Sequence, residues 1–258
     1  MALYDTIGRN YVQTRRSDPR IVTELLRILQ ASSVSTVVDI GAGTGSYALP
    51  LANQGYQVLA VEPSAVMREQ AISHPSIQWF DGCAEHLPLP DQTADAAIVM
   101  LAFHHFQDDR QALQEIYRVI GRGQIVLFTY DPAMIRQFWL TEYFPAFIID
   151  VETTFLPIST LISNIKTITG KAINRVSFPL PRDLADSFMA VGWARPELYL
   201  ERRVRHGISS FSKLNATERD SGLSRLQRDL KTEVWDQQYG HLRTQQNFDI
   251  GYCFLHTH

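Results

Sequence analysis

The stretch VVDIGAGTGSY, residues 37–47, limits the folds open to this chain more than any other feature. A β-branched run ends at Asp39, and glycines follow at alternate positions, Gly41, Gly43 and Gly45. Glycine adopts positive φ and lets neighbouring groups approach the backbone closely. The stretch therefore predicts a buried strand, a tight turn and the start of a helix, which is the repeating unit of a parallel α/β sheet.

The next hundred residues continue that unit. Apolar β-rich runs alternate with runs of helical periodicity, and the first run, 34–40, lacks the alternation of a strand that has one face in water. The expected strands span 34–40, 57–63, 77–80, 95–101 and 124–130. The expected helices span 20–30, 46–54, 65–72 and 112–120, and Ser64 caps the third of them.

After residue 130 the alternation of strand-like and helix-like runs ends. Residues 132–170 show helical periodicity and many large aromatic side chains. Further along we expect a helix over 180–193 that stops at Gly192, a strand over 197–206 and a closing strand over 247–256. The residues NATE at 215–218 form a capping box, which predicts a helix that continues to Val234.

Charge and cysteine content exclude several classes of protein. The formal net charge is −3, so the chain lacks the excess of positive charge that is typical of nucleic-acid-binding proteins. Two cysteines, Cys83 and Cys253, form neither a disulfide framework nor a metal cluster, which fits a reducing compartment. The first ten residues lack the apolar core of a signal peptide, and charged residues and prolines interrupt the apolar part at 133–168, which we interpret as buried helices. We expect a cytoplasmic protein that binds neither nucleic acid nor membrane.

The glycine spacing distinguishes two kinds of cofactor turn. A dinucleotide-binding turn reads G-x-G-x-x-G, whereas this turn reads G-x-G-x-G and has Ser46 at the last dinucleotide position. Glu62 ends the second expected strand, where an acid can accept hydrogen bonds from both ribose hydroxyls. The turn therefore indicates close backbone approach to a nucleoside-containing ligand without the pyrophosphate motif.

Taken together, residues 35–123 resemble the class I S-adenosylmethionine-dependent methyltransferases, and most of all the small-molecule subgroup that includes the ubiquinone/menaquinone-biosynthesis C-methyltransferases. The resemblance is carried by DIGAGTG at 39–45, Glu62, GCAEHLP at 82–88 and the strand end with its following helix at 100–120. It implies a Rossmann-like fold with a seven-stranded, mostly parallel sheet, helices on both faces and helical cap insertions. It also implies that S-adenosyl-L-methionine is the cofactor and S-adenosyl-L-homocysteine the product.

The resemblance further implies a set of cofactor-binding residues. The backbone at Gly41 and Gly43 would approach the methionine moiety, Glu62 would bind the ribose, and Cys83 with Ala84 would face the adenine. The full set is Tyr11, Arg16, Asp39, Gly41, Ala42, Gly43, Glu62, Pro63, Cys83, Ala84, Glu85 and Leu101. Cys83 departs from the family pattern, which has an aspartate there, and a thiol is a weak acceptor.

The segment at 4–21 resembles the family's N-terminal cover segment. Tyr4 and Tyr11 stand seven residues apart, on one helical face, and could close over the acceptor and the cofactor sulfonium. Arg15 or Arg16 could pair with the cofactor carboxylate. The alternative is an amphipathic flap whose tyrosines pack on the core.

The candidate chemistry lies at FHHF, residues 103–106, after the fourth strand. Methyl transfer from a sulfonium needs proximity and alignment, and a base only where the acceptor must lose a proton. His104 and His105 are the candidate bases; the alternative is that they form a pocket wall or cap the next helix. The pair has no third ligand at metal-binding spacing, so we expect no metal site.

The acceptor is expected to be a small organic molecule. The chain lacks the [DN]-P-P-[FY] motif of amino-group methyltransferases, a cytosine-type cysteine nucleophile and the several cysteines of arsenic methyltransferases. The expected acceptor-binding residues, beside the cover segment's Tyr4, are Phe103, Tyr130, Trp139 and Tyr143. Two other functions remain open: an NAD(P)-dependent oxidoreductase, and a non-catalytic module that binds S-adenosylmethionine.

We expect a single domain over 1–258. It is divided into a cover segment at 1–19, a cofactor-binding half at 20–131, helical lid insertions at 132–175 and 208–243, and the remainder of the sheet at 176–207 and 244–258. The sequence does not predict the oligomeric state.

Overall fold

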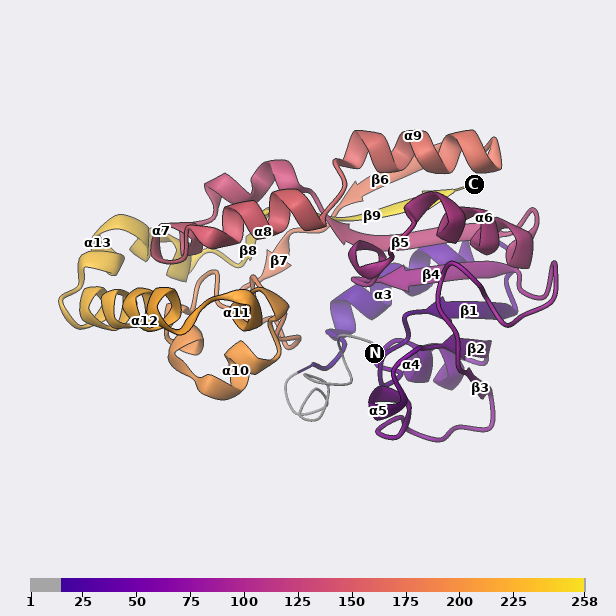
Figure 1. Ribbon diagram of the computed structural model, residues 1–258, viewed down its shortest axis with the longest axis horizontal. Helices are drawn as coiled ribbons and strands as arrows, with labels where there is room; N and C mark the ends of the chain where they lie inside the picture. Colours follow the sequence, from indigo (N-terminus) through magenta and orange to yellow (C-terminus); the bar gives the residue numbers. More distant parts are fainter. Residues whose placement is uncertain (1–14, 258) are drawn as a thin grey trace.

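The computed structural model describes residues 15–257 and contains a seven-stranded sheet with the order β3-β2-β1-β4-β5-β9-β6 (Figure 1). Its strands are β1 (Thr36–Ile40), β2 (Gln57–Val61), β3 (Ile77–Phe80), β4 (Ala96–Met100), β5 (Gln124–Tyr130), β6 (Ile173–Ser177) and β9 (Tyr252–Thr257). β9 is antiparallel to both of its neighbours, and the pairs among β1 to β5 are parallel. The predicted mostly parallel sheet of seven strands is confirmed.

Helices cover both faces of this sheet because successive side chains of a strand point to opposite faces. Val37 of β1 packs in the cluster that holds α3 (Pro19–Gln30) and α4 (Ala48–Asn53). Its neighbour Val38 packs in the cluster that holds α6 (Asp109–Ile120) and α9 (Ile158–Thr169). Every residue of β4 and β5 is buried, and β1 is buried after Thr36, as the lack of alternation in residues 34–40 predicted.

α5 (Ala65–Arg68) follows β2 at the sheet, and the elements after β5, apart from α9, β6 and β9, form a helical cap beside the carboxyl ends of the parallel strands (Figure 1). The cap contains α7 (Leu140–Tyr143), α8 (Ala146–Thr154), α10 (Arg202–His206), α11 (Ser209–Lys213), α12 (Ala216–Lys231), α13 (Val234–Tyr239) and the short strands β7 (Leu180–Pro181) and β8 (Asn247–Phe248). Asn215 caps α12 by accepting from the backbone N–H of Glu218 at 2.8 Å, as the capping box predicted.

Two predicted elements between the strands of the sheet are wrong. Residues 182–193 form turns and no helix, because the buried Tyr199 hydroxyl accepts from Gly192 N–H at 3.1 Å and donates to Met189 C=O at 2.7 Å. The predicted strand at 197–206 is a 3₁₀ helix, Pro196–Leu200, followed by α10. Tertiary contacts of an aromatic side chain override the local pattern here.

The predicted lid boundaries also need correction. The first insertion, predicted over 132–175, includes α9, which packs against α6, and β6, which belongs to the sheet. The region predicted to return to the sheet at 176–207 instead contributes β7, α10 and the turns between them to the cap. The cap therefore consists of 132–157 and 178–251, and α9, β6 and β9 complete the sheet domain.

One helical stretch within the described residues, Ala146–Thr169, is long and apolar enough to cross a membrane by length and composition, with a mean hydropathy of 1.4. In the structure it is two helices, α8 and α9, and Pro157 precedes the second. Only 22% of its most apolar window is buried, and Ile149 is 68% exposed. The helices expected to be buried in this part therefore bury some residues, such as Phe147 and Leu161, and expose others.

Candidate active site

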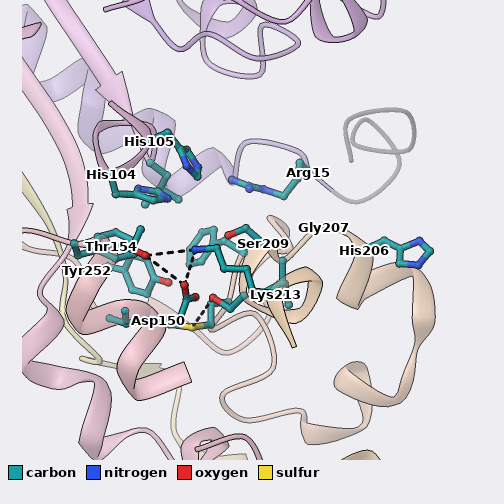
Figure 2. A pocket seen from close by; sticks show the side chains of 17 residues that line it. Arg15, His104, His105, Asp150, Thr154, His206, Gly207, Ser209, Lys213 and Tyr252 are labelled. Atoms are coloured by element: carbon teal, nitrogen blue, oxygen red, sulfur yellow. Dashed lines mark hydrogen bonds and ion pairs between the residues drawn. The ribbon is translucent and has the colours of Figure 1, made fainter. Parts of the chain in front are cut away.

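Two cavities adjoin the carboxyl ends of β1 and β4, where the strand order of the sheet reverses. The larger one, about 540 Å³, is called the turn cavity here; it is lined by the glycine turn, the end of β2 and the segments 82–85 and 100–107. The smaller one, about 60 Å³, lies between the sheet and the cap and is called the cap cavity (Figure 2). Both cavities are lined by Leu101, His104, His105, Thr154 and Lys213.

The glycine turn lies at the floor of the turn cavity. Gly41, Gly43 and Gly45 have φ values of 71°, 59° and 87°, in the left-handed region that favours glycine. A Cβ on Gly41 would come within 2.7 Å of the Ala102 side chain. The turn needs glycine for its backbone conformation and, at Gly41, for contact with the segment after β4.

Glu62 fixes the turn from the neighbouring strand. Its buried carboxylate accepts from the backbone N–H of Gly43 at 2.9 Å and from that of Ser64 at 2.9 Å. Hydrogen bonds to an ionised carboxylate are stronger than those between neutral groups. The carboxylate therefore joins the end of β2 to the glycine turn and lies on the wall of the turn cavity.

Asp39 lies at the end of β1, directly before the turn. It is buried, and its Oδ2 has no hydrogen-bond partner among the described residues. Burial, with a smaller contribution from the negative charge of Glu62, raises the pKa of Asp39 to about 7. A buried carboxyl oxygen without a partner is costly, and protonation of the carboxyl, which the raised pKa favours, lowers that cost.

The two histidines lie in a 3₁₀ turn, Phe103–His105, after β4. The His104 ring stacks on Phe155 with 4.2 Å between ring centroids and lies 4.0 Å from the ring of His105. Burial lowers the pKa of His105 to about 4 and that of His104 well below its usual value, and the charges of Lys213 and Arg15 lower both further. Both imidazoles are therefore neutral at neutral pH.

Leu101 precedes this turn in a strained conformation. Its φ is 53°, which is uncommon for a residue with a branched side chain, and it lines both cavities. Strained backbone of this kind persists where surrounding structure holds it, often at functional sites.

Two ion pairs flank the cap cavity. The Nε of Arg15 is 2.5 Å from Oδ1 of the buried Asp186, and the Nζ of Lys213 is 2.5 Å from Oδ1 of Asp150. Thr154 joins the second pair, with its hydroxyl 3.4 Å from the Lys213 nitrogen. Figure 2 shows Arg15 extending toward the histidines and the Lys213 nitrogen below them, joined to Asp150 and Thr154.

The comparisons with known proteins agree with this geometry. The family described as "Methyltransferase domain" matches residues 38–128. An uncharacterized methyltransferase of Oceanobacillus iheyensis is 30% identical over 151 residues, which cover 55% of this chain and 71% of the relative. The demethylmenaquinone methyltransferase of Streptomyces avermitilis is 27% identical over 177 residues, 67% of this chain and 74% of that protein.

A solved structure is more similar over the full length. It comes from Anabaena variabilis, where it is named as a putative methyltransferase from an antibiotic biosynthesis pathway, and it is 45% identical with a TM-score of 0.91. The alignment covers 95% of this chain and 99% of that one. The chain belongs to the class I S-adenosylmethionine-dependent methyltransferases. The similarity extends through the cap, beyond the region matched by the family.

The methyltransferase brings most of its predicted cofactor residues to the turn cavity. The residues that line it are Gly41, Gly43, Glu62, Pro63, Cys83, Ala84, Glu85 and Leu101. Ala42 lies in the turn and Asp39 at the end of β1 directly before it, and neither lines the cavity. The Glu85 carboxylate accepts a hydrogen bond from the backbone N–H of Gln107 at 2.6 Å, which fixes the segment directly before α6.

The predicted residues of the N-terminal segment fall into two groups. Tyr4 and Tyr11 lie outside the described residues. Arg16 is exposed and lines neither cavity, whereas its neighbour Arg15 lines the cap cavity. The sequence alone did not show which of the two arginines lines a cavity. In the structure it is Arg15, whose guanidinium pairs with the buried carboxyl of Asp186.

The predicted acceptor-binding aromatic residues do not line either cavity. Phe103 packs in the core beside α6, Tyr130 lies in the sheet core, Trp139 donates to Trp193 C=O at 2.8 Å, and Tyr143 bonds Asp229 at 3.2 Å. The aromatic walls of the cap cavity are instead Phe155, Phe188 and Tyr252.

Sequence reasoning also missed Asp150, Thr154 and Lys213, although lysine is rare in this chain (four, against twenty arginines). Among the described residues, no group of three or more His, Cys, Asp or Glu could hold a metal ion.

Asp39 gives the methyltransferase a testable dependence of stability on pH. The folded pKa of about 7 lies above the ordinary value of 3.8, so the folded state keeps a proton that the unfolded chain loses, and stability falls as pH rises to about 7. Asp39→Asn removes this titration. Urea unfolding of both proteins at pH 5 and pH 8 should show that the variant gains about 3 kcal/mol relative to the wild type over this range. An equal difference at the two pH values would contradict the assignment.

Proposed function

We propose that this methyltransferase binds S-adenosylmethionine in the turn cavity and methylates a small organic molecule bound in the cap cavity. The observation that carries this proposal is the wall shared by the two cavities, formed by Leu101, His104, His105, Thr154 and Lys213. Ligands on the two sides of this wall would meet beside the end of β4, where open α/β sheets bind their ligands.

The residues of the turn cavity fit the cofactor. The glycine turn allows close approach of the methionine moiety, and Glu62 is fixed on the cavity wall where it can bind ribose hydroxyls. Cys83 and Ala84 would face the adenine. When bound, S-adenosylmethionine supplies a methyl group activated by its positively charged sulfur.

The protein itself contributes position, alignment and exclusion of water. Stacked aromatic and imidazole rings surround the end of β4, and the cap covers it. The histidines are poor general bases, because burial lowers the pKa of His105 to about 4 and that of His104 well below its usual value, and such imidazoles accept a proton weakly at neutral pH. We therefore assign them to the wall of the site, where their neutral rings add no positive charge beside the sulfonium.

The protonation state of the histidines is a prediction of its own. Since burial and two nearby cations lower the pKa of His105 to about 4, its ring should show no titration between pH 5.5 and 8 in an NMR experiment on protein labelled at histidine. His105→Gln identifies the resonance. Because the folded pKa is lowered, the linked stability is present above the ordinary value of 6.5 and is lost as pH falls toward 4. An inflection near 6.5 would contradict the assignment.

Calorimetric titration with S-adenosylmethionine, S-adenosylhomocysteine and NAD(P) tests the cofactor. We expect the first two to bind and NAD(P) not to bind; NAD(P) binding without S-adenosylmethionine binding would overturn the proposal. An untargeted search with isotopically labelled S-adenosylmethionine and a metabolite extract then tests catalysis. A labelled small product is expected, and cofactor binding without any labelled product would favour a non-catalytic binding module.

The free thiols Cys83 and Cys253 support a cytoplasmic location.

A further inference from the structure

Resting on the proposed function, we propose that the methyl acceptor is an organic anion whose negatively charged group, of the carboxylate kind, is held between Arg15 and Lys213 in the cap cavity. These two side chains are the cations that line this cavity beside the histidine pair. They come from segments far apart in the chain, one preceding α3 and the other ending α11.

Both cations are held in place by the protein. Asp186 is 2% exposed and does not line the cavity, so it lies behind Arg15 and positions the guanidinium, whose side chain is 12% exposed. Asp150 and Thr154 direct the Lys213 nitrogen toward the shared wall. His206 contributes to the lining, but its ring points away from the cavity in Figure 2 and accepts from Arg202.

The two cations keep an electrostatic effect in spite of their carboxylate partners. Each of them lowers the pKa of both His104 and His105, and Asp150 raises that of His105, so the two cations still act on the histidine side of the cavity. A carboxylate placed there would gain charge-assisted hydrogen bonds, and an arginine guanidinium matches its planar geometry.

The charge of the cofactor adds a second reason. Lys213 lines the turn cavity as well as the cap cavity, so a cationic sulfonium would be bound near a lysine. Like charges in a partly dehydrated site repel. A negative group on the acceptor would offset this repulsion, whereas a cationic amine acceptor would increase it. The walls formed by Phe155, Phe188 and Tyr252 favour a planar or apolar body for the rest of the acceptor.

The class of acceptor can be tested without knowing its name. A metabolite extract of the source cells is passed over an anion exchanger at pH 7, and each fraction is incubated with the protein and labelled S-adenosylmethionine. We expect the acceptor to be retained and to elute with salt. Label formed only from the unretained fraction would overturn the anionic acceptor while the proposed methyl transfer stands. Label in no fraction would overturn both.

Variants then test the two cations with the active fraction. Arg15→Gln and Lys213→Met should each raise the acceptor KM by about tenfold or more and change kcat less, because the lost contact is a charge pair. The affinity for S-adenosylhomocysteine, which lacks the sulfonium charge, should stay within about twofold, which separates this outcome from loss of the cofactor site. Unchanged KM in both variants would overturn the proposal.

Matched controls exist on the surface of the same chain. Arg136→Gln removes an exposed arginine that pairs with Glu152, and Lys166→Met removes an exposed lysine of α9; neither lines the turn cavity or the cap cavity, and both should leave KM unchanged. Because Arg15→Gln leaves Asp186 buried beside a neutral group, Arg15→Lys serves as the second variant. It keeps the charge and should restore part of the acceptor affinity, and failure to restore any would count against recognition by charge.

Discussion

Gly43→Val should abolish measurable binding of S-adenosylmethionine while the chain remains folded. Gly43 lines the turn cavity at a φ of 59°, and a valine there would place a branched side chain in the space proposed for the methionine moiety. An L-residue in the left-handed region costs about 1–2 kcal/mol, which is a fraction of the stability of a domain of this size. Calorimetry with S-adenosylhomocysteine should show affinity lower by about a hundredfold or more.

The backbone strain of this substitution needs its own control. Gly170, at the end of α9, has a φ of 69°, and a Cβ added there would meet no atom within 4 Å. Gly170→Val therefore introduces similar strain in open space and should leave cofactor affinity unchanged. Wild-type cofactor affinity of the Gly43→Val protein would refute the placement of the cofactor. An equal loss of affinity in the Gly170→Val protein would show that backbone strain causes the effect.

Glu62→Gln should weaken cofactor binding by about 10–100-fold. The carboxylate of Glu62 accepts from two backbone N–H groups, those of Gly43 and Ser64, and an amide has one oxygen and directs its NH₂ group at the other donor. Losing charge-assisted hydrogen bonds and leaving a buried donor unpaired costs about 1.5–3 kcal/mol. The ribose contact proposed for the same carboxylate would weaken as well.

Calorimetric titration of S-adenosylhomocysteine measures this change. Glu152→Gln is the matched control, because Glu152 lines neither the turn cavity nor the cap cavity and its ion pair with Arg136 is exposed. Unfolding curves of both variants show whether the glycine turn stays folded. If a folded Glu62→Gln protein bound S-adenosylhomocysteine with wild-type affinity, Glu62 would not be a cofactor-binding residue.

The turn cavity, where we propose that the cofactor binds, could be predicted from sequence because its determinants are local. A strand end, the three glycines of the turn and the acid at the end of the next strand are fixed by a few neighbouring residues, and parallel strands bring their carboxyl ends to one edge of the sheet. The structure places Gly41, Gly43 and Glu62 on one cavity, at the edge where the sequence predicted them. The paired histidines after β4 also lie at this edge.

The cap could not be predicted in the same way. Trp139 and Tyr143 were expected to bind the acceptor, yet they form the interior of the cap, where Trp139 packs against Tyr199 and Trp235. An aromatic residue in a helical insertion has the same sequence pattern whether it fills a core or lines a cavity. Arg15 and Asp186 are 171 positions apart, and no spacing rule connects them.

By itself, the sequence determined the sheet, the glycine turn and the family, because these follow from hydrophobic periodicity and from backbone conformations that glycine alone adopts readily. Only the tertiary structure decided which aromatic residues and which charges line the cap cavity, where we propose that the acceptor binds. Burial and long-range ion pairs select Phe155, Arg15 and Lys213 for the cap cavity. They depend on how the cap packs against the sheet, which is a property of many weak contacts between distant segments.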